Sequence, residues 1–133
     1  MIVLASIGRF MEKVLGNAAY LILYLVAGIA GNMTSLAWHP FAMSEGASGA
    51  IFGLYGALWA VFVCRRQTVP AETWARRPKV MTALVGCGLL YGLFCREINV
   101  AAHLGGLGSG FLLGLFLTPS IAQEAVVELA RAG

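Results

Sequence analysis

Residues 45–57 read EGASGAIFGLYGA, a stretch in which glycine recurs every three or four residues. It opens an uncharged run, residues 46–64, whose only serine is Ser48. On a helix, Gly49 and Gly53 share a face, and small residues at this spacing let membrane helices pack closely. Taken alone, the pattern indicates a packing face with Ser48 as a bystander.

The composition indicates a membrane protein. Hydrophobic residues make up 59% and charged residues 11% of the 133 residues, with a mean hydropathy of +0.82. A soluble domain of this length cannot bury so much apolar surface. Compared with the roughly 20 apolar residues that cross a bilayer, the intervals between charges predict an all-α, polytopic bundle. Its four transmembrane helices are expected at approximately 14–33, 46–64, 79–96 and 99–117.

The charges predict the orientation of these spans. Five basic residues lie between the second and third spans and oppose a single acid, Glu72: Arg65, Arg66, Arg76, Arg77 and Lys79. By the positive-inside rule, loop 65–79 is cytoplasmic, as is the C-terminal tail, residues 118–133. The net charge of +3 therefore reflects topology, and no nucleic-acid partner is predicted.

A second segment changes the interpretation of Ser48. Residues 101–106 read AAHLGG, and His103 is the only ionisable side chain in the fourth span. Ser48 and His103 each follow a glutamate at the non-cytoplasmic start of a span, within roughly 10 Å of the same membrane face at 1.5 Å per residue. A histidine inside a span indicates function, although a structural histidine bonded to a backbone carbonyl is the alternative. The two residues are a candidate nucleophile and base.

The carboxylate of a catalytic triad has no candidate. The sequence contains no aspartate, and none of its six glutamates lies inside a predicted span, so a hydrolase of this sequence would use a dyad.

The three cysteines show no metal-like spacing and are interpreted as unpaired thiols: Cys64, Cys87 and Cys95. No metal or cofactor is predicted. His39 lies in residues 34–46, an aromatic and helix-breaking stretch expected to be a surface loop.

Glycines predict which helices are neighbours. They recur along one face of each of two spans: Gly49, Gly53 and Gly56 in the second, and Gly106, Gly110 and Gly114 in the fourth. Faces of this kind allow two backbones to approach closely. The second and fourth spans are therefore expected to pack against each other.

The stretch Gly46-Ala47-Ser48-Gly49, followed by residues 102–106 (AHLGG), resembles the catalytic core of the rhomboid intramembrane serine proteases. The resemblance runs from residues 10–16 to Gly114 and implies a single rhomboid-like membrane domain over residues 1–133. It implies Ser48 as nucleophile and His103 as general base, acting on transmembrane protein substrates in the lipid bilayer through an acyl-enzyme.

The resemblance also implies supporting residues. Phe52 takes the place of an aromatic residue, tyrosine in many members, that packs against the histidine ring. The oxyanion would be met by backbone N–H groups near Ala47 and Ser48. Helix-packing glycines complete the set: Gly46, Gly49, Gly53, Gly106 and Gly110.

The family core has six helices, and the two that should precede Gly16 are absent from these residues. The second of them normally brings histidine and asparagine side chains that help to hold the oxyanion. We therefore expect the C-terminal two-thirds of a rhomboid, whether a gene fragment, a sequence with a mispredicted start at Met1 or a shortened relative, that is weak or inactive as written.

Two other functions stay open at this point. The chain could be a non-catalytic relative that binds transmembrane clients, although a binder needs neither Ser48 nor His103. It could also be part of a transporter with His103 in a proton path, but the spans offer few further polar residues to line such a path. The sequence predicts no oligomeric state.

Overall fold

The computed structural model describes residues 8–9, 11–12, 15–38, 40, 47–64, 71–94 and 99–118, with the backbone alone at 71–78, 80, 81 and 93. Four long helices follow one another within these ranges: α2 (Asn17–Trp38), α3 (Ser48–Cys64), α4 (Ala71–Phe94) and α5 (Val100–Leu117). No strand occurs in the described part, which confirms the predicted all-α class. The tail, residues 119–133, and loop residues 41–46 and 65–70 lie outside this description.

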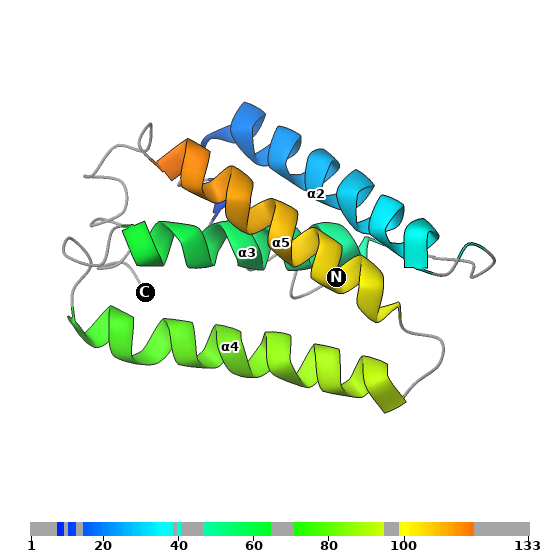
Figure 1. Cartoon of the computed structure of the whole chain (residues 1–133). Coiled ribbons are helices and arrows are strands. Elements are labelled where there is room, and N and C mark those ends of the chain that lie inside the picture. Colours follow the sequence, from blue (N-terminus) through cyan, green and yellow to red (C-terminus); the bar gives the residue numbers. More distant parts are fainter. Residues whose placement is uncertain are drawn as a thin grey trace.

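Helices α2, α3 and α5 form a tight cluster, and α4 lies along its side (Figure 1). In Figure 1, α3 and α5 run in the same direction, and α2 runs opposite to both. The first residues of α3 and α5 and the last residues of α2 therefore lie at one end of the bundle. This arrangement brings Ser48 and His103 to the same end.

Helix α2 ends later than the sequence analysis predicts. The first span was expected to end at residue 33 and a loop to follow, but α2 continues to Trp38. Residues 34–38 (TSLAW) contain no helix breaker, and the first proline is Pro40, which disfavours helical geometry at the residue before it. Thr34 also bonds within its own helix, because its Oγ1 donates to the Ala30 carbonyl at 2.8 Å. The assignment of residues 34–38 to a loop is wrong.

Helix α4 begins earlier than expected. The interval 65–79 was assigned to a loop because of its charges, yet α4 starts at Ala71 and runs through Pro78. Alanine, glutamate and arginine, the strong helix formers, make up most of residues 71–77. Proline inside helices is tolerated in membrane proteins, where neighbouring groups satisfy the freed carbonyl. Charge marks a boundary of the apolar core, and it does not mark the end of a helix.

Helices α3 and α5 approach closely through their glycines. A Cβ placed on Gly106 would lie closer than 3.0 Å to the carbonyl oxygen of Gly49, and one on Gly110 would lie equally close to that of Gly53. Real Cβ atoms essentially never come so near to backbone atoms, so glycine is required at both positions. A Cβ on Gly56 would meet the Leu107 carbonyl in the same way.

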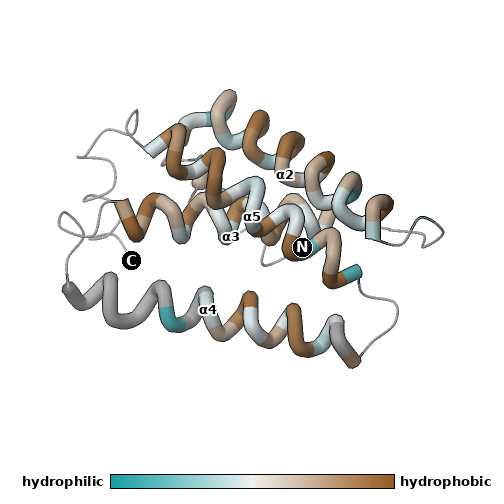
Figure 2. Tube along the Cα trace, viewed as in Figure 1, coloured by the Kyte–Doolittle hydropathy of each residue, from teal (hydrophilic) through white to brown (hydrophobic). Residues whose placement is uncertain are grey.

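Helix α3 is the centre of the bundle, and α2 presents a large apolar surface. From Gly49 to Phe62 every residue of α3 is buried except Ile51 and Trp59. Hydrophobic residues run along α2 (Figure 2), and the large exposed ones are Leu21, Ile22, Leu25, Val26, Ile29, Met33, Leu36 and Trp38. By length and composition, α2 and α5 could each cross a membrane. Residues 48–64 and 82–92 form shorter apolar helices.

Candidate active site

Ser48 is the first residue of α3 and is partly buried, directly after an exposed turn at Ala47. The helix begins here because the amide of Ile51 donates to the Ala47 carbonyl at 3.0 Å. The first N–H groups of a helix have no partner within it, and the helix dipole makes this end attractive to negative charge. Ser48 therefore lies at the end of α3 that favours negative charge.

His103 lies in the first turns of α5, and its side chain is only 5% exposed. Its imidazole stacks on the ring of Phe52, with a centroid distance of 4.1 Å and an interplanar angle of 6°. Phe52 follows Ser48 by four residues, so the two side chains share one face of α3. The face of α3 that carries Ser48 is thus the face that touches the imidazole.

One nitrogen of His103 is left without a partner. The Nδ1 atom is buried, and no atom of the described residues is placed to form a hydrogen bond with it. An unpaired buried polar atom costs about 1–3 kcal/mol, and such exceptions call for an explanation, of which a catalytic role is one.

Asn99 and Ser35 are polar residues at this end of the bundle that the sequence analysis missed. Asn99 caps α5, because its Oδ1 accepts a hydrogen bond from the Ala102 amide at 3.0 Å. Its Nδ2 donates to Oγ of Ser35, a fully buried residue of α2. An asparagine directly before an apolar run is a recognised N-cap signal. Nothing in the sequence marks Ser35, because its partner is distant along the chain.

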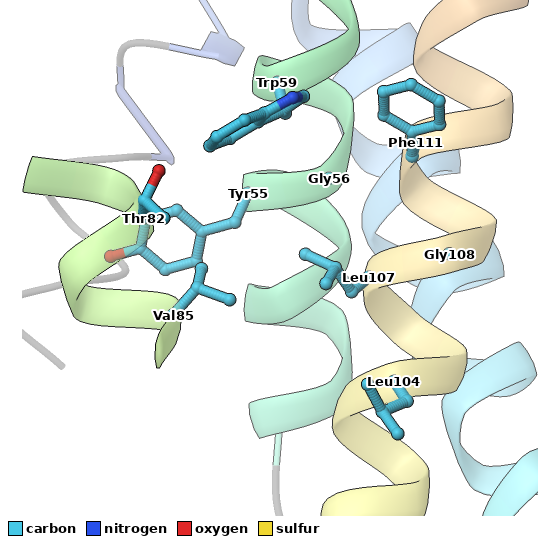
Figure 3. A pocket seen from close by; sticks show the side chains of 9 residues that line it. All are labelled: Tyr55, Gly56, Trp59, Thr82, Val85, Leu104, Leu107, Gly108 and Phe111. Carbon is cyan, nitrogen blue, oxygen red and sulfur yellow. The ribbon is translucent and has the colours of Figure 1, made fainter. Parts of the chain in front are cut away.

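A cavity of about 440 Å³ lies deeper in the bundle, between α3, α4 and α5 (Figure 3). Its lining is almost entirely apolar and consists of Tyr55, Gly56, Trp59, Thr82, Val85, Leu104, Leu107, Gly108 and Phe111. Tyr55 points from α3 towards α4, where it lies beside Thr82 and Val85. Neither Ser48 nor His103 lines this cavity. Within the described residues, no group of three histidine, cysteine or acidic side chains could hold a metal ion.

Helix α4 reaches the site through Gly88. A Cβ on Gly88 would lie 2.9 Å from Cζ of Phe52, so the glycine lets α4 approach the ring that supports His103. The remaining glycine of the predicted set, Gly46, lies outside the described residues, as does His39.

The family model of the Rhomboid domain matches residues 1–120. The chain belongs to the rhomboid family. This finding confirms the resemblance that the two motifs carry. Membership of this family, together with two helices long enough to cross a bilayer, makes this rhomboid an integral membrane protein.

Rhomboids from bacteria and yeast are among its relatives. The chain is 36% identical over 104 residues to the putative rhomboid protease YdcA of Bacillus subtilis, covering 77% of this chain and 50% of YdcA. It is 34% identical to the rhomboid protease GluP of the same organism, covering 80% of this chain and 20% of GluP. Rhomboid protein 1, mitochondrial, of Saccharomyces cerevisiae is 32% identical, covering 100% of this chain and 41% of that protein. The chain thus spans half or less of each, and no solved structure matches it significantly.

The stacked ring in this rhomboid gives a first testable prediction. Phe52→Leu keeps an apolar side chain and removes the stacking on His103, so we expect a loss of about 1 kcal/mol of stability, the usual value of an aromatic pair. Phe116→Leu is the matched control, because Phe116 is 79% exposed on α5. Unfolding in mixed micelles measures both. Equal stability of the two variants would show that the stacking contributes nothing.

Proposed function

We propose that this rhomboid domain is an intramembrane serine endopeptidase that cleaves transmembrane protein substrates, with Ser48 as nucleophile and His103 as general base. The observation that carries the proposal is the stacking of His103 on Phe52, one turn along α3 from Ser48. It supports a common depth and a common face for the two side chains. The protease names of YdcA and GluP support the same reaction class.

In the proposed reaction, Ser48 Oγ attacks a peptide carbonyl of the substrate and passes its proton to His103. In this proposal Nε2 receives the proton, since Nδ1 is buried and has no hydrogen-bond partner among the described residues. The protonated imidazole then donates to the leaving amine as the C–N bond breaks, which leaves an acyl ester on Ser48. Water, deprotonated by the same imidazole, hydrolyses the ester and restores the serine.

The developing oxyanion would be held by the N–H groups of Ala47 and Ser48 at the start of α3. In this proposal the dyad lies near the non-cytoplasmic face, and the basic residues between positions 65 and 79 are cytoplasmic. Substrate helices would reach Ser48 from within the lipid bilayer.

A non-catalytic role is the second candidate. The chain is 29% identical to Inactive rhomboid protein 1 of Danio rerio, covering 88% of this chain. In this role the chain would bind transmembrane clients and leave them intact. The joint presence of Ser48 and His103 favours the protease.

Cleavage of a model transmembrane substrate in liposomes tests the proposal. We expect the 133 residues alone to cleave slowly, because the resemblance places further oxyanion donors on a helix ahead of Gly16, and loss of one such donor costs about 10²–10³ in rate. A version extended at its N-terminus by two spans of a related rhomboid should cleave faster, and Ser48→Ala should abolish cleavage by both.

Two outcomes would contradict this account. Rapid Ser48-dependent cleavage by the 133 residues alone would show that no further donors are needed. An extended version that binds the substrate without cutting it would overturn the protease proposal and favour the non-catalytic role.

A further inference from the structure

Three helices meet where α5 begins. A Cβ on Gly31 of α2 would lie 2.7 Å from the carbonyl oxygen of Ala102 and 3.4 Å from Cα of Gly49. Helix α2 therefore touches the residue before His103 and the residue after Ser48. An interaction that holds α2 against α5 at this level therefore also holds the backbone next to Ser48 and His103 in place.

Asn99 connects α5 to α2 through the oxygen and the nitrogen of its side-chain amide. Its Oδ1 accepts from the Ala102 amide, and its Nδ2 donates to the buried Ser35 hydroxyl on α2. Its backbone carbonyl accepts from the His103 amide at 3.2 Å. One residue thus caps α5, anchors α5 to α2 and is hydrogen-bonded to the backbone of His103.

We propose that the Asn99–Ser35 pair is a clamp that positions the imidazole of His103 against Phe52. Asn99 and Ser35 are positioning residues, since they act through the backbone of the first turn of α5. The value of the clamp for catalysis rests on the proposed function, but its effect on the ring does not. A stacked ring at a 4.1 Å centroid distance depends on the placement of α5 relative to α3, and the clamp holds α5 at its start.

Substitutions can separate the clamp from the helix cap. Ser35→Ala removes the bond between helices and leaves Asn99 free to cap α5. Asn99→Asp keeps a capping oxygen and can accept a hydrogen bond from the Ser35 hydroxyl, so it retains both functions with the clamp bond reversed. Asn99→Ala removes both. Ser109→Ala is the matched control, because the Ser109 hydroxyl bonds to Gly106 within α5 itself.

The ring position can be read by NMR without any catalysis. The sequence has two histidines, so selective ¹³Cε1 labelling of histidine in micelles gives two signals, and His39→Gln assigns them. The ring current of Phe52 should shift the His103 signal upfield, and Phe52→Leu should remove that shift. We expect Ser35→Ala and Asn99→Ala to lose most of the shift. Asn99→Asp and Ser109→Ala should keep it.

A His103 signal in Ser35→Ala that matches the parent would overturn the clamp. If Ser35→Ala fails to fold, Ser35→Cys, a somewhat larger side chain with a weaker acceptor, is judged by the same signal. The rate of Ser48 labelling by a fluorophosphonate is measured alongside and should fall about 10–100-fold in Ser35→Ala, the usual cost of a misplaced catalytic group. Absence of labelling in the parent would count against the proposed function, whereas the NMR signal alone decides the clamp.

Discussion

Replacing Gly106 or Gly110 with alanine is expected to push α3 and α5 apart and to destabilise the bundle by about 1–3 kcal/mol, the usual cost of overpacking. Each added Cβ would meet backbone of α3, at Gly49 or at Gly53, closer than real Cβ atoms come. Backbone cannot turn aside as a flexible side chain can, so the helices themselves must move. Leucine at either position should prevent assembly or displace His103 from Phe52.

Gly108 and Gly86 provide the controls for this expectation. A Cβ at either position would meet nothing within 4 Å, so Gly108→Ala on the same helix and Gly86→Ala on α4 should not destabilise the bundle. Unfolding in mixed micelles compares all four variants. If Gly106→Ala were as stable as Gly108→Ala, the close approach of α3 and α5 would be wrong.

The sequence predicts the all-α class well because a bilayer allows very few backbone structures. Long uncharged intervals have to be helices in a membrane, since every backbone group needs a partner there. The recurrence of glycine on the runs that became α3 and α5 also carries information about packing, because only glycine permits the contacts seen at Gly106 and Gly110. The two short motifs around Ser48 and His103 also predict the family, which the match to the Rhomboid domain confirms.

Helix ends were harder to predict. The sequence assigns the last residues of α2 to a loop because residues 34–46 are aromatic and helix-breaking, and it assigns the first residues of α4 to a loop because they are charged. A helix can extend beyond the apolar core, and its end is set by breakers such as Pro40 and by contacts made elsewhere. Ser35 is buried by packing on α5, and a hydropathy pattern does not report that contact.

The candidate site likewise has residues that the sequence predicts and a contact that it does not. Ser48 and His103 stand out because a polar residue in an apolar run is conspicuous. The Asn99–Ser35 bond joins residues 64 positions apart and depends on how α2 crosses α5. Such a contact follows from the three-dimensional packing, and the sequence around either residue gives no sign of it.

The second large effect concerns Ser48 itself, whose reactivity depends on a base that removes its proton. Without His103 we expect the rate of covalent modification at Ser48 to fall by about 10²–10⁴, the usual contribution of general base catalysis. His39→Gln is a matched control for His103→Gln, since it makes the same chemical change at the other histidine. Ser109 serves as an internal reference, because its hydroxyl donates to the Gly106 carbonyl within α5 and it has no part in the proposed site.

The measurement that tests the dyad most directly is fluorophosphonate labelling of the purified 133-residue chain, with the modified residue identified by peptide mass spectrometry. The account predicts modification at Ser48, absent in Ser48→Ala, strongly slowed in His103→Gln and unchanged in His39→Gln. Modification of Ser48 at the same rate with and without His103, or no faster than that of Ser109, would contradict it.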